Sequence, residues 1–249
     1  MNPYFDFNLN KINDVHSSIT DFPIDYNIFP LAKNCKMYTV ELTKDQYIFI
    51  PSLWYHWIFT EPNTLSVHYE IPFIDFGDDN VFLTSVEKNM PFYKSVDNPD
   101  NITYDKFINN SLEYKYAAIF SETNDCIPVK KNNTFKFLYE TSLKNIINIS
   151  KNKNYYTYIG YNYIDDNNIL SSYKNLDYIL NPIYYHRMFY KSSVWFTIDK
   201  KINSGLHNDS TINIINVIDG KKTIYLFNPD CKDNLYINKF SLIPTLYID

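Results

Sequence analysis

The stretch QYIFIPSLWYHWIFTEPNTLSVHYEI, Gln46 to Ile71, places a single histidine among aromatic residues before a second histidine-containing segment. Its two ends, residues 47–51 and 65–71, are rich in β-branched and aromatic residues, which is typical of β-strands. We therefore expect two strands that flank a loop, with His56 in that loop between two aromatic neighbours. The rest of the sequence must show whether His56 has partners.

The composition describes a chain that can bury a full core. With 249 residues and 45% hydrophobic residues, one large domain is expected. The bias toward Asn, Ile, Lys and Tyr is typical of an AT-rich genome, such as that of a large DNA virus or a protist. The net charge of −5 and the lack of a Lys/Arg run argue against a nonspecific binder of nucleic acid.

The cysteines and the chain's hydropathy favour an intracellular, cytoplasmic location, in an infected host cell if the source is viral. The three cysteines are far apart and form neither a zinc motif nor a disulfide framework, which fits a reducing compartment. The N-terminus has no charged and apolar regions of a signal peptide. No apolar run reaches membrane-spanning length, so no membrane partner is expected.

Patterns along the chain predict a mainly β fold that is interrupted by helices. A further strand is expected at 37–42 in the first part of the chain. Asp219-Gly220 is typical of a hairpin turn. Strands near both ends of the chain predict one barrel or sandwich whose two halves flank a helical segment. Helices are expected at 103–114, with Thr103 as N-cap, at 134–150 and at 170–180, and later strands at 155–164, 193–199, 211–218 and 222–227.

A His-x-Asp motif, His207-Asn208-Asp209, is the main candidate for a metal site. In a strand, residues i and i+2 point to the same face, so the imidazole and the carboxylate can bind one ion. A third ligand would complete a 2-His-1-carboxylate triad, which leaves open positions as in non-haem Fe(II) oxygenases. Taken alone, the motif is equally compatible with a surface histidine beside a turn aspartate.

Further residues stand around this motif and in the opening stretch: Trp195, the loop Ser204-Gly205-Leu206, Asn213, Gly220-Lys221-Lys222, Leu226-Phe227-Asn228-Pro229, Ile50-Pro51, Trp54-Tyr55-His56 and Ser66-Val67-His68-Tyr69. Together with His207 and Asp209, they resemble the JmjC and cupin-like family of 2-oxoglutarate-dependent oxygenases. The resemblance implies a double-stranded β-helix (a jelly-roll or cupin barrel) with flanking α-helices, and Fe(II) and 2-oxoglutarate as cofactors. It also implies that His56 is the third metal ligand beside His207 and Asp209.

The two halves of the resemblance occur in reversed order. In the family the His-x-Asp half comes first, whereas here the distal-histidine half occupies residues 1–71 and the His-x-Asp half residues 191–249. We predict a circularly permuted single domain, with a connector at 72–100 and a helical elaboration at 101–190. The alternative is a domain-swapped homodimer in which residues 1–71 complete the barrel of a neighbouring chain.

The resemblance also implies residues that bind the cosubstrate. Lys222 would pair with the distal carboxylate of 2-oxoglutarate, and Asn213, Ser204 and Tyr158 would assist. The alternatives are a solvated hairpin lysine for Lys222, a buried strand asparagine for Asn213 and core packing for Tyr158. His68 stands where family members often have asparagine, so it is predicted either to hydrogen-bond the cosubstrate or to supply a further nitrogen to the metal. His16 and His186 lack a motif context, so we expect their side chains to be partly exposed or satisfied by local hydrogen bonds.

The resemblance leads to a predicted function and to competing hypotheses. A 2-oxoglutarate-dependent hydroxylase that acts on a protein or peptide side chain is the first expectation, and a tRNA-base hydroxylase is the second. Histone demethylation is disfavoured because no zinc-binding cysteine cluster is present. A cupin that uses Zn or Mn for isomerase or hydrolase chemistry is a third hypothesis, and a binding module without catalysis is a fourth.

Overall fold

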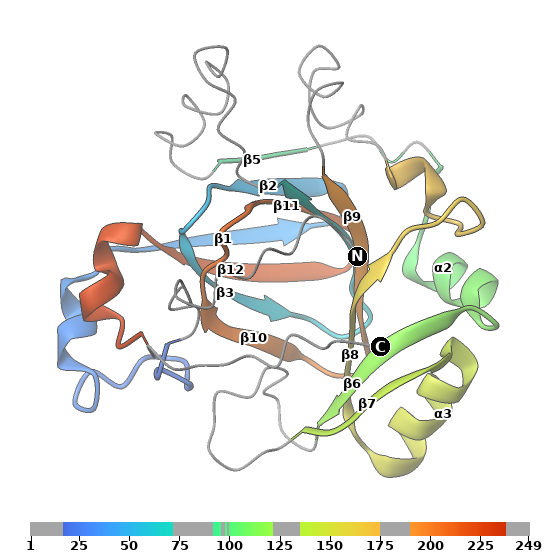
Figure 1. Ribbon diagram of the computed structural model, residues 1–249, viewed down its shortest axis with the longest axis horizontal. Helices are drawn as coiled ribbons and strands as arrows, with labels where there is room; N and C mark the ends of the chain where they lie inside the picture. Colours follow the sequence, from blue (N-terminus) through green and yellow to red (C-terminus); the bar gives the residue numbers. More distant parts are fainter. Residues whose placement is uncertain are drawn as a thin grey trace, which may run out of the picture.

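The computed structural model shows a β-barrel with the two described α-helices on one side (Figure 1). The structure describes the following residues: 17–71, 92–95, 98, 100–121, 135–174 and 190–237. His16, His186 and the connector residues 72–91 therefore lie outside the described residues, as do both chain ends.

The barrel consists of eight strands that alternate between two facing sheets. A smaller sheet has the order β1-β12-β3-β10, and β2, β11, β4 and β9 are neighbours in a larger one. Each strand of the first group, β1 to β4, and of the second, β9 to β12, lies in the other sheet from its predecessor. This alternation is the jelly-roll topology that was expected for the fold. The bounds are β1 Met37–Thr43, β2 Gln46–Ile50, β3 Tyr55–Thr60, β4 Leu65–Ile71, β9 Lys191–Ile198, β10 Ile202–His207, β11 Ile212–Asp219 and β12 Lys221–Phe227.

Four further strands and two helices extend and cover the larger sheet. Strand β5 pairs with β2 at one edge, and β8, β6 and β7 continue from β9 at the other. The two helices begin at side-chain caps: Thr103 accepts a hydrogen bond from the backbone of Lys106, and Ser142 from that of Asn145. The bounds are β5 Phe92–Ser95, α2 Tyr104–Ser111, β6 Lys115–Ser121, β7 Phe135–Ser142, α3 Leu143–Lys153 and β8 Tyr156–Tyr163, with 3₁₀ turns at Pro30–Asn34 (η1), Ser171–Lys174 (η3) and Pro229–Asn234 (η6).

Separate apolar clusters fill the barrel and cover its two outer faces. Side chains that alternate along β2, β11 and β12, including Ile48, Ile215 and Ile224, pack together between the sheets. The outer face of the larger sheet packs against α2 and α3 through residues such as Phe196 and Phe107. Because apolar residues occupy the interior of this part of the barrel, the polar side chains that also point inward need a specific explanation.

The first and last described strands are neighbours. Strand β1 pairs antiparallel with β12, from Met37 opposite Phe227, and Ser17 forms a bridge with Ile237. Figure 1 shows the blue start and the red end of the described chain together beside the smaller sheet. A barrel whose strand order has been circularly permuted requires this neighbourhood, so the pairing supports the predicted permutation.

Several expected elements differ in the structure. Residues 135–142 are strand β7 and not the first half of a helix, because their aromatic and β-branched residues alternate with a period of two. Asp219-Gly220 is a turn with φ +88° at the glycine, but β11 and β12 lie in different sheets and form no hairpin. The loop expected around His56 is strand β3, and the loop expected at 204–206 belongs to β10.

The parts of the chain outside the barrel are less helical than expected. Three strands, β6, β7 and β8, lie within the segment 101–190, and β5 lies within the range 72–100. Of the helix expected at 170–180, the described part is a 3₁₀ turn over Ser171–Lys174. None of the helices in the described residues is long and apolar enough to cross a membrane.

Candidate metal centre

His56 lies inside the barrel on the central strand pair of the smaller sheet. It is the second residue of β3, between β12 and β10, and only 2% of the residue is exposed. Its Nδ1 atom lies 3.0 Å from the carbonyl oxygen of Trp54. Since a carbonyl can only accept, Nδ1 carries a proton, and this bond directs the Nε2 atom of His56 toward the barrel interior.

His207 is the last residue of β10 and lies directly opposite His56 in the strand pairing. The two ring centroids are 4.3 Å apart. The Nδ1 atom of His207 lies 3.0 Å from the carbonyl oxygen of Gly205, so this imidazole is oriented in the same way. Both histidines are therefore positioned to offer Nε2 as a metal ligand, with Nδ1 held by a backbone carbonyl.

Asp209 follows β10 and does not belong to the strand, so the expected i, i+2 strand geometry is wrong. The carboxylate reaches the site because its backbone is held: the Leu53 N–H donates to the Asp209 carbonyl at 2.8 Å. Its Oδ2 atom lies 3.3 Å from Nε2 of His56 and accepts a hydrogen bond of 2.7 Å from the Asn213 amide. The side chain is 38% exposed, which places it toward the open end of the barrel.

The electrostatics of the site favour an ionised carboxylate. Burial by itself would raise the pKa of Asp209. When the imidazoles of the metal-free site are protonated, the hydrogen bond from His56 and the positive charges of His207 and His56 outweigh this effect. The amide of Asn213 contributes in the same direction, and together these groups hold the pKa of Asp209 well below its usual range. A metal cation between the carboxylate and Nε2 of His56 would be held by the same two atoms.

The three side chains form a donor set suited to a metal ion. One ligand atom from each of His56, His207 and Asp209 lies within 4.8 Å of the other two, and this is the one such group in the described residues. Two imidazole nitrogens and one carboxylate oxygen match the facial triad that binds Fe(II) and leaves positions open. All three ligands come from one chain, so the barrel needs no neighbouring chain to bring them together.

Lys222 lies in the barrel interior on β12, as the resemblance implied. The residue is fully buried, and its Nζ donates to the hydroxyl of Thr60 on β3 at 3.3 Å. A buried ammonium group is costly unless an anion or several hydrogen bonds compensate it. Lys222 is thus suited to bind a carboxylate group that enters the barrel.

His68 lies in the same interior on β4 and is neutral. Burial, followed by the charges of Lys222 and His56, lowers its pKa well below the usual value for histidine. Its Nε2 lies 3.2 Å from the Ser66 hydroxyl, which itself donates to the Trp195 carbonyl at 3.1 Å. The Ser66 oxygen therefore accepts a hydrogen bond from the Nε2–H group of His68, and Nδ1 of His68 is left as an acceptor.

The wall beside His68 consists of stacked rings. Trp195 stacks on His68 at 4.9 Å with an interplanar angle of 15°, and the Tyr158 ring lies 5.0 Å from Trp195 at an angle of 49°. The Trp195 indole packs directly against the backbone at Gly160, because a Cβ atom at this position would come within 2.4 Å of the indole. The structure thus brings Tyr158, His68 and Lys222 into the barrel interior; whether they bind a cosubstrate stays a prediction.

Ser204 has a clear backbone role. The strand pairing of β10 with β3 shifts between residues 203 and 206, which marks a β-bulge. The Ser204 hydroxyl accepts a 3.1 Å hydrogen bond from the Ile58 N–H and donates to the Gly205 carbonyl. It thereby holds the bulge that precedes His207, and its predicted role toward the cosubstrate stays a prediction.

Sequence reasoning missed Glu70 and the backbone carbonyls that orient the two histidines. Burial, followed by the charge of Asp209, raises the pKa of Glu70 to about 7, and Lys191 opposes this. Glu70 lies two residues after His68 in a strand, so period-two alternation could have placed it on the same face. The carbonyls of Trp54 and Gly205 carry no signal in the sequence, because every residue has one.

Comparisons with known proteins agree with this geometry. Residues 76–246, more than half of the chain, match the cupin-like domain family. The chain belongs to this cupin-like family. It is also 26% identical over 242 residues to JmjC domain-containing protein L887 of Acanthamoeba polyphaga mimivirus, in a match that covers 88% of this chain. The chain spans only 38% of the length of that relative. No solved structure matches this chain.

The comparisons also bear on the order of the two barrel halves. The cupin-like match leaves out residues 1–75, which contain β1 to β4 and His56. The match to the mimiviral protein covers so much of this chain that it must include both His56 and His207 in their present order. Both observations fit the predicted circular permutation, which stays a prediction.

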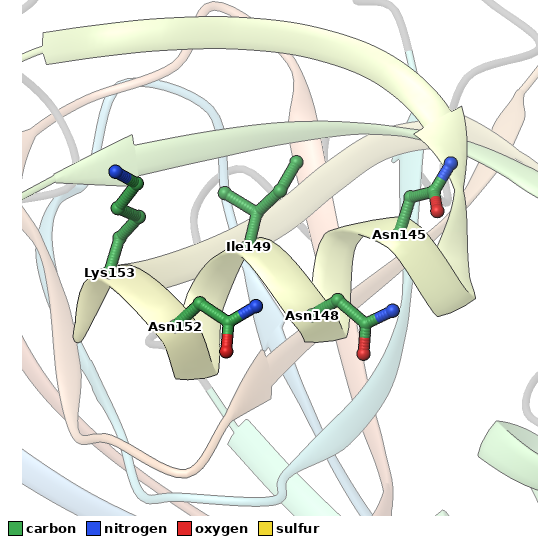
Figure 2. A pocket seen from close by; sticks show the side chains of 5 residues that line it. All are labelled: Asn145, Asn148, Ile149, Asn152 and Lys153. Atoms are coloured by element: carbon green, nitrogen blue, oxygen red, sulfur yellow. The ribbon is translucent and has the colours of Figure 1, made fainter.

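A surface hollow elsewhere on the protein takes no part in this site. It has a volume of about 330 Å³ and lies along α3, where asparagine side chains project outward (Figure 2). Its lining residues all come from this helix: Asn145, Asn148, Ile149, Asn152 and Lys153. None belongs to a strand that carries a metal-ligand candidate.

Proposed function

We propose that this cupin-like protein is an Fe(II)- and 2-oxoglutarate-dependent oxygenase that hydroxylates a protein side chain. The observation that carries the proposal is the convergence of His56, His207 and Asp209 in one barrel that also buries Lys222. The membership in a family whose JmjC members are generally oxygenases supports it.

His56, His207 and Asp209 would hold the metal. A metal in such a site supplies the activation of dioxygen, coupled to the oxidative decarboxylation of 2-oxoglutarate. The protein contributes the orientation of the ligands, because the Trp54 and Gly205 carbonyls fix the two imidazoles. Around a divalent metal, two neutral imidazoles and one carboxylate would leave a net positive charge that attracts a dianion.

Lys222 would bind the distal carboxylate of 2-oxoglutarate. Its ammonium group already has a hydroxyl partner in Thr60, and the buried environment strengthens its attraction for an anion. Asn213 would keep the Asp209 carboxylate in place through its 2.7 Å hydrogen bond. The ring wall of Trp195 and Tyr158 would exclude water from one side of the cosubstrate.

A different class of function is a cupin-like module that binds without catalysis. The two hypotheses differ in a turnover assay without prime substrate, with Fe(II), ascorbate and 2-oxoglutarate. We expect succinate to form slowly with the wild-type protein and not with H207A. If neither protein binds iron or forms succinate, the oxygenase proposal is wrong and the binding module is favoured.

A further inference from the structure

The inner face of β4 leads from the closed interior of the barrel to its open end. Ser66, His68 and Glu70 alternate on this face, and exposure increases in that order: Ser66 is fully buried, His68 is 7% exposed and Glu70 is partly exposed. Glu70 therefore lies at the mouth of the barrel, where a substrate would enter.

Glu70 lies close to the metal-ligand candidates. In the strand pairing it is directly opposite Asn213 on β11, whose amide donates to Asp209. Directly opposite residues in antiparallel strands have Cβ atoms about 4.5–5.5 Å apart. Asn213 is thus the neighbour that Glu70 shares with Asp209, the carboxylate that would bind the metal.

No cation contacts the carboxylate of Glu70 in the described part of the chain, where it makes neither a hydrogen bond nor an ion pair. Lys191, its partner on β9, directs its ammonium group to the Tyr163 hydroxyl at 3.3 Å and to the face of that ring at 5.3 Å. Burial and the charge of Asp209 raise the pKa of Glu70, and the charge of Lys191 only partly opposes them.

The formal charges of the loaded site point to the kind of group that fits there. The charges of a divalent metal and Lys222 balance those of Asp209 and dianionic 2-oxoglutarate. Of the remaining charges, the Lys191 ammonium is directed to Tyr163, so the Glu70 carboxylate leaves a negative charge at the mouth that a cationic side chain would neutralise. A phosphate-bearing nucleic acid would instead be repelled, which argues against the tRNA hypothesis.

We propose that Glu70 is a substrate-recognition residue that binds the cationic group of a lysine or arginine side chain beside the metal. This inference rests on the proposed function for its position near the reacting atoms. It names the substrate class as a basic segment of a protein.

The test compares matched peptides on the protein loaded with Mn(II) and 2-oxoglutarate. Fluorescent peptides carry a single lysine or arginine, and their neutral counterparts carry acetyl-lysine or citrulline at the same place. Fluorescence anisotropy should show the charged peptides binding at least about tenfold tighter, a difference of 1.4 kcal/mol. The preference should shrink as salt rises and disappear in E70Q, whereas E70D should retain part of it.

Control variants and outcomes separate the two proposals. In E61Q, which changes a glutamate that pairs with Lys201 on the surface, the preference should persist. Equal binding of charged and neutral peptides by wild type, no peptide binding at all, or a preference that survives in E70Q would overturn the assignment. Succinate formation without peptide is measured in parallel: its absence contradicts the oxygenase proposal alone, whatever the peptides show.

Discussion

The two halves of the barrel, residues 37–71 and 191–227, orient a histidine by the same device. Each half supplies four strands that alternate between the sheets, and each histidine directs Nδ1 to the carbonyl oxygen two residues before it, at 3.0 Å in both cases. The local geometry of the two ligands is therefore nearly the same, although about 150 residues separate them.

The halves differ in everything around that histidine. His56 lies on a regular, buried strand and its half adds no carboxylate ligand. His207 follows a bulge, and its half also supplies Asp209, Asn213 and Lys222. The first half thus provides a single, rigidly held ligand candidate, and the second provides the carboxylate ligand candidate and the buried lysine. Only their pairing through β3–β10 and β2–β11–β4 completes the site.

The largest effect is expected when the buried positive charge that the second half supplies is removed. K222M removes the ammonium group and keeps most of the apolar volume. Truncating one partner of a buried charge pair costs roughly 2–5 kcal/mol, so the apparent KM for 2-oxoglutarate should rise at least about 30-fold. The free energy of unfolding should be unchanged or higher, because a buried charge is lost.

Steady-state kinetics and urea denaturation test this prediction, with K221M as the control. Lys221 is the neighbouring residue but pairs with Glu41 on the surface. An unchanged KM in K222M would contradict the cosubstrate role of Lys222.

The next effect probes how the second half supports its carboxylate. N213A removes the amide that donates to Asp209 at 2.7 Å. Loss of such a supporting hydrogen bond typically costs about 10–100-fold in metal affinity. A competition titration with a chelator measures it, and an affinity equal to that of wild type would show that Asp209 is positioned without Asn213.

A smaller effect concerns Glu70, which the first half contributes at the mouth. Its pKa is raised from 4.5 to about 7 in the folded protein, so ionisation is unfavourable there. Its contribution to stability is full below pH 4.5 and is lost as the pH rises through 7. Between pH 5 and pH 8, the metal-free wild type should lose roughly 1–3 kcal/mol of unfolding free energy relative to E70Q. Urea titrations at both pH values test this, and a constant difference would contradict it.

An effect of similar size on the free energy of unfolding concerns the bulge that distinguishes β10 from β3. S204A leaves the Ile58 N–H without its 3.1 Å partner. We expect a loss of about 1–3 kcal/mol in unfolding free energy, with a KM for 2-oxoglutarate close to that of wild type. A large rise in that KM would instead support the cosubstrate role that the sequence suggested for Ser204.

The sequence was informative where residue type and period determine the structure. Alternating residues located β1, β2, β4, β8, β9, β11 and β12, and the His-x-Asp motif with its flanking residues located the candidate ligands. Pairing partners could not be read, because they depend on contacts between distant residues. For this reason Asp219-Gly220 was taken for a hairpin, although the chain crosses there from one sheet to the other.

The rest of the site depends on features that residue letters do not encode. His56 was expected in the loop between strands at 47–51 and 65–71, yet Tyr55–Thr60 form a separate strand, β3. The carbonyl partners of both histidines and the position of Asp209 beyond β10 follow from backbone geometry. Glu70 became a candidate only when its register opposite Asn213 was known.

The central claim is that the two halves share one metal ion, and an anaerobic Fe(II) titration of the wild type, H56A and H207A tests it most directly. We predict one bound ion per chain in the wild type and a loss of affinity in each variant larger than the roughly 10–100-fold expected for a supporting residue. If H56A bound Fe(II) as tightly as the wild type while H207A did not, His56 would not be a ligand and the shared site would be contradicted.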